Sequence, residues 1–193
     1  IARSVLIGRA TNWVRQLVET PPNLLGPEQF ADAVRALANE LAPEVVTVPQ
    51  WDAEQLAERG FGGTLGGGAG SSRTPLVIEL TAGEGEVVGL AGKGITFDSG
   101  GINLKRDASE LAWMKSDMAA AASVAAAVVV SAALGGGRAT HAILPVAENL
   151  PGTRAQRPGD VVTHPGGRTT EVTDTDCEGR LVLADAISWL SRT

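Results

Sequence analysis

The sequence has little cysteine and no cluster of basic residues, and both shortages narrow the possible functions. Cys177 is the only cysteine among the 193 residues. An internal disulfide is therefore excluded, which is consistent with a reducing compartment. The 16 basic residues are outnumbered by 22 acidic ones and form no run, and the net charge is −6. Because phosphate binding needs a basic stripe, the composition argues against a nucleic-acid surface.

The sequence also lacks a strongly apolar segment of the length that a membrane span needs. The apolar stretch from Met118 to Leu134 consists mostly of Ala, Ser and Val, whereas a span needs about 20 predominantly apolar residues. We therefore expect a buried helix packed closely against a sheet, and no membrane contact. We expect no secretory signal in the first residues, because Arg3, Arg9 and Arg15 recur within a helical pattern.

Apolar residues recur with helical or strand spacing along the whole chain. No internal repeat or low-complexity linker divides the sequence, which indicates one α/β domain. We expect a three-layer sandwich with a central mixed, mostly parallel sheet flanked by helices. The expected helices span residues 2–19, 27–41, 52–58, 109–134 and 180–191, and the expected strands span residues 45–48, 75–80, 86–91, 139–146 and 169–172.

One segment is unusually rich in glycine. Seven of the eleven residues from Gly60 to Gly70 are glycine. Such a composition is typical of an irregular loop that approaches a ligand or another backbone closely. We therefore predict no regular structure there.

Two separated segments carry ionisable residues that together could hold two metal ions. The first runs from Gly92 to Lys105 and is followed by MKSDM, and the second is TDTDCEGRL. Carboxylates without histidine suit hard or borderline divalent cations, which favours metal-assisted hydrolysis. The candidate ligands are Lys93, Asp98, Asp117, Asp176 and Glu178, with Lys105 and Arg180 as cations beside them.

Lys93 follows an apolar strand, in the region where α/β folds place their ligands. We expect the Gly100-Gly101 pair to let the loop double back, so that Lys93 and Asp98 meet at one ion. A phosphate loop is excluded, because Val87 stands where the motif requires glycine. Taken alone, Lys93 is more typical of a surface or salt-bridge residue, since lysine binds a metal only after losing its proton.

The remaining acidic residues are open to ordinary structural interpretations. Asp117 lies in an otherwise apolar helical stretch, where a buried carboxylate needs a partner. A salt bridge to Lys115 or a solvated helix face is the alternative to metal binding. Asp176 and Glu178 are two positions apart, so in an extended segment both carboxylates would project to the same side. An Asp-x-Glu pair by itself is common on protein surfaces.

Several motifs together carry a family resemblance. GKGITFDSGG, MKSDM and TD-x-EGRL followed by VLADA resemble the leucine aminopeptidase family of dinuclear metallopeptidases. The resemblance also covers TPPN, the glycine segment GFGGTLGGGAGSS, and ENLPG with RPGD. It spans nearly the whole chain in the expected order.

The resemblance implies two divalent metal ions, manganese or zinc, per subunit. Matched by motif position, Asp98 and Glu178 would bridge both ions. Lys93 and Asp117 would complete the more tightly held site, and Asp176 the more exchangeable one. The implied reaction is hydrolysis of the N-terminal bond of peptides with a free N-terminus and a leucine-like first residue.

The resemblance also implies roles for three further residues. Lys105 and Arg180 would be the catalytic pair, with a bicarbonate on Arg180 as general base. A fixed ammonium such as Lys105 can stabilise an oxyanion, and the Arg180 fork suits a carboxylate-like anion. Met114 stands where the family lines the pocket for the N-terminal side chain, and Lys105 would also contact substrate.

The chain departs from the family pattern in its spacing and in its extent. RDASELAWMKS is one residue longer than the usual spacing, and alignment on MKSDM selects Asp117 rather than Asp107 or Glu110 as the ligand. Residues 1–193 would be an incomplete catalytic domain without the family's N-terminal domain. We expect the full-length protein to be a cytoplasmic homo-hexamer. The alternative function is a metal-binding but catalytically incomplete fragment with a role in assembly.

Overall fold

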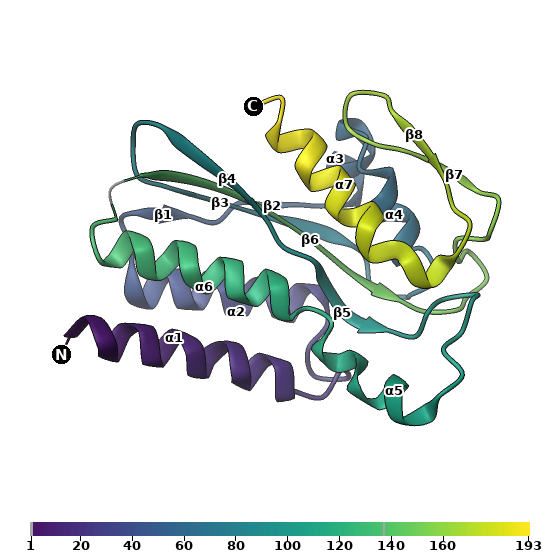
Figure 1. Ribbon diagram of the computed structural model, residues 1–193, viewed down its shortest axis with the longest axis horizontal. Coiled ribbons are helices and arrows are strands. Elements are labelled where there is room, and N and C mark those ends of the chain that lie inside the picture. Colours follow the sequence, from purple (N-terminus) through teal and green to yellow (C-terminus); the bar gives the residue numbers. More distant parts are fainter. Residues whose placement is uncertain (1, 137) are drawn as a thin grey trace.

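The computed structural model describes residues 2–136 and 138–193 and has three layers, with a mixed sheet between two layers of helices (Figure 1). This arrangement confirms the predicted α/β sandwich. The helices are α1 (Ala2–Glu19), α2 (Pro27–Leu41), α3 (Ala53–Arg59), α4 (Gly62–Gly68), α5 (Ala108–Trp113), α6 (Ala119–Ala133) and α7 (Glu178–Leu190), with 3-10 helices η1 (Met114–Ser116) and η2 (Thr175–Cys177). The main sheet contains β1 (Val46–Thr47), β2 (Gln50–Trp51), β3 (Leu76–Ala82), β4 (Val87–Ala91), β5 (Gly94–Asp98) and β6 (Ala139–Asn149), and β7 (Val161–Thr163) pairs separately with β8 (Thr169–Glu171).

β6 is the central strand of the main sheet. β3 pairs with it in antiparallel fashion on one side, and β4 and β5 pair with it in parallel along successive parts of its other edge. β1 and β2 pair antiparallel with β3, so β3 runs against the other strands. Gly92 and Lys93 occupy the break between β4 and β5.

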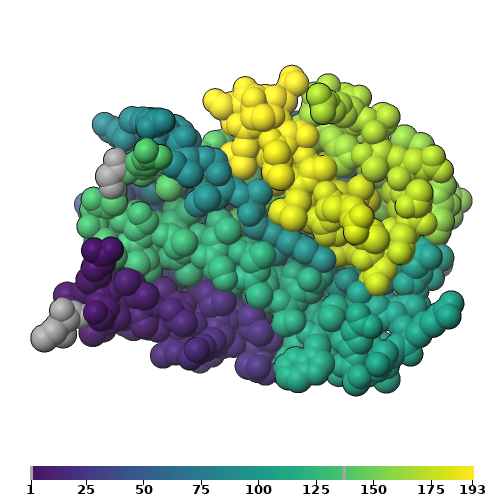
Figure 2. All heavy atoms as spheres, viewed as in Figure 1, coloured from purple at the N-terminus to yellow at the C-terminus, as the bar shows by residue number. Residues whose placement is uncertain are grey.

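Successive residues of a strand point to opposite faces of the sheet. Both faces are buried, because helices cover each of them. Ile78 and Leu144 belong to the core shared with α1, α2 and α6. Val77, Ile143 and Phe61 belong to the core on the opposite face, under α3, α4 and α7 (Figure 1). Figure 2 shows α1, in purple, and α7, in yellow, on opposite sides of the molecule. The long apolar strands are thus explained by burial on both faces.

The prediction of irregular structure in the glycine-rich segment is wrong, because residues Gly62–Gly68 form helix α4. A Cβ on Gly63 would lie 2.6 Å from the carbonyl oxygen of Leu181, and one on Gly62 would lie 2.4 Å from that of Thr163. The expected close approach to another backbone is therefore present. Tertiary contacts that only glycine permits outweigh its low helix propensity.

A buried carboxylate anchors the start of α4. Asp185 of α7 accepts hydrogen bonds from the Thr64 amide (2.7 Å) and hydroxyl (2.8 Å), and its other oxygen lies 2.6 Å from His164 Nδ1. His164 Nε2 in turn lies 2.9 Å from the Thr170 hydroxyl. Burial raises the pKa of Asp185, although the bonds from His164 and Thr64 act in the opposite direction. This network ties α4, α7 and the β7–β8 hairpin together.

Replacing His164 with alanine is expected to lower the free energy of unfolding by about 3 kcal/mol, because Asp185 would lose a partner in a buried site. Urea denaturation of the metal-free chain measures this difference. His141→Ala is the matched control, since His141 pairs with Glu79 at a partly exposed site and its loss should cost about 1 kcal/mol or less. Equal effects of the two substitutions would contradict the assignment of the network as a stabilising link.

The single helix expected over residues 109–134 is also wrong, because the structure interrupts it. α5 ends at Trp113, η1 follows, and α6 begins only at Ala119. Asp117 lies in the break, where its carboxylate pairs with Lys93, and the Ala121 amide donates to the Lys93 carbonyl (3.0 Å). These contacts with the β4–β5 break override the continuous helical pattern of the sequence.

Contrary to the expectation from the sequence, the region Ala108–Ala133 is long and apolar enough, by length and composition alone, to cross a membrane. In the structure, α6 instead packs against the sheet and against α1 and α2. Its buried side chains are small, as predicted for a core helix, and include Ala121, Ala122 and Ala125.

Candidate metal centre

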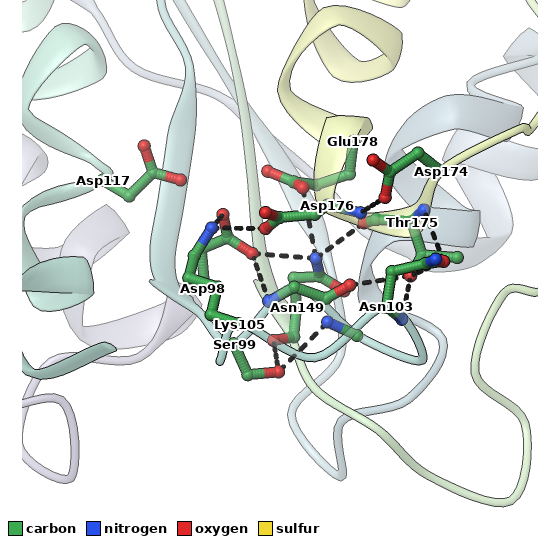
Figure 3. A network of polar contacts seen from close by, with 12 residues as sticks. Asp98, Ser99, Asn103, Lys105, Asp117, Asn149, Asp174, Thr175, Asp176 and Glu178 are labelled. Atoms are coloured by element: carbon green, nitrogen blue, oxygen red, sulfur yellow. Dashed lines mark hydrogen bonds and ion pairs between the residues drawn. The ribbon is translucent and has the colours of Figure 1, made fainter. Parts of the chain in front are cut away.

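Asp98, Asp176 and Glu178 lie where strands β5 and β6 end and helix α7 begins, and Asp117 lies between η1 and α6 (Figure 3). Asp98 is the last residue of β5 and pairs in register with Asn149, the last residue of β6. Glu178 is the first residue of α7, and Asp176 lies just before it in η2. The carboxyl ends of parallel strands are the usual ligand-binding edge of an α/β sheet.

Three carboxylates converge at this edge. One oxygen each from Asp98, Asp176 and Glu178 lies within 4.8 Å of the other two. Asp98 and Glu178 are 3% and 0% exposed. Burial, followed by the charge of Asp98, raises the pKa of Glu178 to about 7. Buried like charges at this spacing require cations nearby.

Lys93 supplies one of these cations. Its ammonium lies 2.7 Å from Asp117 Oδ2 and 2.9 Å from Glu178 Oε1. Burial disfavours the ammonium, but the charges of Glu178 and Asp117 outweigh burial and raise the pKa of Lys93. Coordination of a divalent cation by Lys93 would therefore release this proton.

Glycine makes room for Lys93. A Cβ on Gly179 would lie 2.5 Å from Lys93 Nζ, and a Cβ on Gly92 would lie 2.7 Å from the Cα of Ala121. Side chains at these two positions would displace the lysine or the start of α6. The glycines that precede Lys93 and follow Glu178 are thus part of the site.

Lys105 supplies the second cation. Its ammonium lies 3.0 Å from Asp98 Oδ2 and also contacts Asp176. Burial opposes the charge, but hydrogen bonds to Asp176 and Asp98 raise the pKa of Lys105. The turn at Gly100 and Gly101, whose φ angles are 88° and 69°, folds the chain back. It brings Lys105 onto Asp98, and the expected meeting of Lys93 and Asp98 at one ion stays a prediction.

The donor set fits divalent cations. Among the described residues, Asp117 Oδ2 and Glu178 Oε1 are buried without a hydrogen-bond partner, although both contact the Lys93 ammonium. Burial raises the pKa of Asp117 more strongly than Lys93 lowers it. Two buried carboxylate oxygens that both contact one ammonium are suitable ligands for a cation that replaces its charge.

The prediction that Asp176 and Glu178 lie in an extended segment is wrong. The Asp174 side chain accepts a hydrogen bond from the Asp176 amide (2.9 Å) and starts η2, which leads directly into α7. A helical turn, not a strand, places the two carboxylates near each other. The alternative pairing of Asp117 with Lys115 does not occur, because the Lys115 ammonium contacts Glu19 at 2.8 Å.

The other two predicted residues lie next to the acidic groups in sequence. Met114 is half-buried in η1, three positions before Asp117. Arg180 is exposed in the first turn of α7. Within residues 2–136 and 138–193, Arg180 forms no ion pair with the acidic groups.

Asn149, which is 5% exposed and contacts two of the carboxylates, was not among the residues selected from the sequence. Thr175 was also missed; its hydroxyl donates to the Gly100 carbonyl (2.7 Å) and holds the turn before Lys105. The sequence position of Asn149 could have indicated its role, since a polar residue at the end of a long buried strand marks the ligand-binding edge of the sheet.

The chain is similar to known proteins along most of its length. The sequence model of the cytosol aminopeptidase family, catalytic domain, matches residues 12–193. A probable cytosol aminopeptidase of Rhodococcus jostii is 47% identical over 97% of this chain, and one of Micrococcus luteus is 47% identical over 97%. The chain covers only 37% and 36% of these relatives.

Two solved structures resemble the fold closely. The bottromycin maturation enzyme BotP in complex with Mn has a TM-score of 0.91 and 42% identity over 100% of this chain and 42% of its own. The cytosol aminopeptidase from Coxiella burnetii has a TM-score of 0.87 and 35% identity, over 93% of this chain and 38% of its own. The similarity thus extends over almost every element of the chain.

Proposed function

This chain belongs to the cytosol aminopeptidase family, and on that basis we propose that it is the metal-binding part of a metal-dependent aminopeptidase. The proposed reaction is hydrolysis of the N-terminal peptide bond, with a preference for leucine-like first residues. The observation that carries the proposal is the convergence of four carboxylates and two lysines at one edge of the sheet.

Five residues would hold two divalent cations, manganese or zinc. The oxygen and amine donors suit both metals, and the complex of BotP with Mn supports manganese. Asp98 and Glu178 would contact both ions, Lys93 and Asp117 one, and Asp176 the other. Bound there, two cations would activate a water molecule and polarise the scissile carbonyl.

Lys105 would stabilise the oxyanion that develops on the scissile carbonyl. Its ammonium is held between Asp98 and Asp176, so it needs no reorganisation when charge develops. The exposed Arg180 would carry an anionic general base such as bicarbonate, because its guanidinium offers a fixed fork for a carboxylate-like anion. Met114 would contact the side chain of the N-terminal substrate residue.

A further part of the proposal concerns the longer protein to which residues 1–193 would belong. Because the chain spans less than half the length of its relatives, we propose that residues 1–193 are part of a larger catalytic domain. The full-length protein would be a cytoplasmic homo-hexamer acting on peptides with a free N-terminus. The same short coverage favours the second candidate function, a metal-binding fragment that needs further segments for catalysis and serves in assembly.

Hydrolysis of leucine p-nitroanilide tests the proposed function directly. The 193-residue chain, stripped of metal and then titrated with Mn²⁺ or Zn²⁺, is expected to gain activity in step with metal occupancy. Removal of the metal by a chelator should abolish that activity, because the reaction depends on an activated water.

Asp98→Ala is the control, and it should remain inactive at every metal concentration. Metal binding without turnover by the parent chain would select the fragment with a role in assembly. Absence of both metal binding and turnover would contradict the proposed function.

A further inference from the structure

Asn149 occupies a central position among the acidic side chains (Figure 3). Its backbone carbonyl accepts hydrogen bonds from the Ser99 amide (2.9 Å) and the Ser99 hydroxyl (2.8 Å). These bonds and the parallel pairing with Asp98 hold its backbone at the end of β6. The side chain therefore starts from a fixed point beside the carboxylates.

The Asn149 side-chain nitrogen faces three acceptors from three segments of the chain. It lies 2.9 Å from Asp98 Oδ1, 3.1 Å from Glu178 Oε2 and 3.0 Å from the Thr175 carbonyl oxygen. Only the amide nitrogen, not the amide oxygen, can donate to such a set, which determines the orientation of the group. Because the amide carries two hydrogens, the three acceptors share them.

A neutral donor has a particular advantage at this place. Asp98 and Glu178 are both buried, so their repulsion is strong. A lysine or arginine in place of Asn149 would neutralise a carboxylate but would also compete with a divalent cation. The amide can restrain both carboxylates and leave their charge available for a metal.

We propose that Asn149 is a positioning residue for the metal pair, and that its amide holds the carboxylates of Asp98 and Glu178 at the spacing needed to share cations. This inference rests on the proposed function. It adds that the shared amide restrains the two carboxylates relative to each other, whereas the Gly100 amide on Asp98 and the Lys93 ammonium on Glu178 each hold only one of them. Partners of this kind typically contribute about 10–100-fold to metal affinity.

Mn²⁺ binding to the full 193-residue chain tests the proposal without relying on activity. Free Mn²⁺ is followed by EPR during titration, and the bound ions are examined for the spectrum of a spin-coupled pair. Asn149→Ala is expected to weaken binding by about 10–100-fold and to remove the coupled-pair spectrum. Asn149→Ser, which leaves a smaller gap and one hydroxyl, is expected to lose less in the same direction and serves if the alanine variant does not fold.

Asn103→Ala is the matched control. The Asn103 side chain accepts bonds from the Thr175 amide (3.1 Å) and hydroxyl (3.0 Å), so it belongs to the same network. Among the described residues it makes no hydrogen bond to Asp98 or Glu178. Its loss should therefore leave the coupled-pair spectrum in place.

Equal weakening by Asn103→Ala and Asn149→Ala would reduce Asn149 to a general structural role and overturn the inference. Parent-like Mn²⁺ binding and spectrum in a folded Asn149 variant would also overturn it, while leaving the proposed function intact. A parent chain that binds no Mn²⁺ would overturn both.

Discussion

Replacing Lys105 with methionine is expected to lower kcat for leucine p-nitroanilide by about 10²–10³, the usual cost of losing a preorganised donor to an oxyanion. The Lys105 side chain is only 7% exposed and is fixed by Asp98 and Asp176. Methionine keeps most of the volume of the side chain but removes its charge. Initial rates over a range of substrate concentrations separate kcat from KM.

The metal affinity of the Lys105→Met variant distinguishes catalysis from structural damage. Removing a cation beside Asp98 and Asp176 should not weaken Mn²⁺ binding, because it leaves both carboxylates more available to the metal. Lys115→Met is the matched control, since Lys115 pairs with the exposed Glu19. An unchanged kcat in the Lys105 variant, or an equal loss in the Lys115 variant, would refute the proposed role.

Replacing Glu178 with glutamine is expected to lower Mn²⁺ affinity by more than about 100-fold, because even partners outside the ligand set contribute about 10–100-fold. Glu178 is completely buried and lies within reach of Lys93, Asp98 and Asp176. Glutamine has nearly the same shape, so the fold should survive while the anionic ligand is lost. Turnover should disappear at metal concentrations that saturate the parent chain.

Isothermal titration calorimetry with Mn²⁺ measures this loss, and circular dichroism verifies that the variant is folded. The matched control is Glu171→Gln on strand β8, where the carboxylate is exposed. Mn²⁺ affinity in the Glu178 variant equal to that of the parent chain would show that other residues hold the ions. It would remove Glu178 from the proposed ligand set.

The apolar periodicity of the sequence was sufficient to predict an α/β domain and several of its helices and strands. Residues such as Phe30, Val34 and Leu37 recur at helical spacing and are buried on one face of α2. The continuous apolar run over residues 139–146 predicted a strand, and the structure confirms it as part of β6. These predictions succeeded because hydrophobic burial acts on local, periodic patterns.

The local predictions failed where distant contacts outweigh local preference. Helix α4 forms from glycines because Thr64 and Gly63 receive support from Asp185, more than a hundred residues away in the chain. The helix before α6 breaks at Asp117 because that carboxylate is paired with Lys93. Neither effect can be found from propensities, which describe only near neighbours.

The sequence by itself determined the chemistry of the site: which carboxylates and lysines are available, and that their types suit divalent cations. Only the tertiary structure decided their partnerships, with Lys93 between Asp117 and Glu178, and Lys105 on Asp98. It also brought in Asn149, a neutral residue that no charge pattern reveals. The reason is physical, since ligand type is a property of single residues, whereas spacing, burial and shared hydrogen bonds arise only when strands β5 and β6 and helix α7 meet.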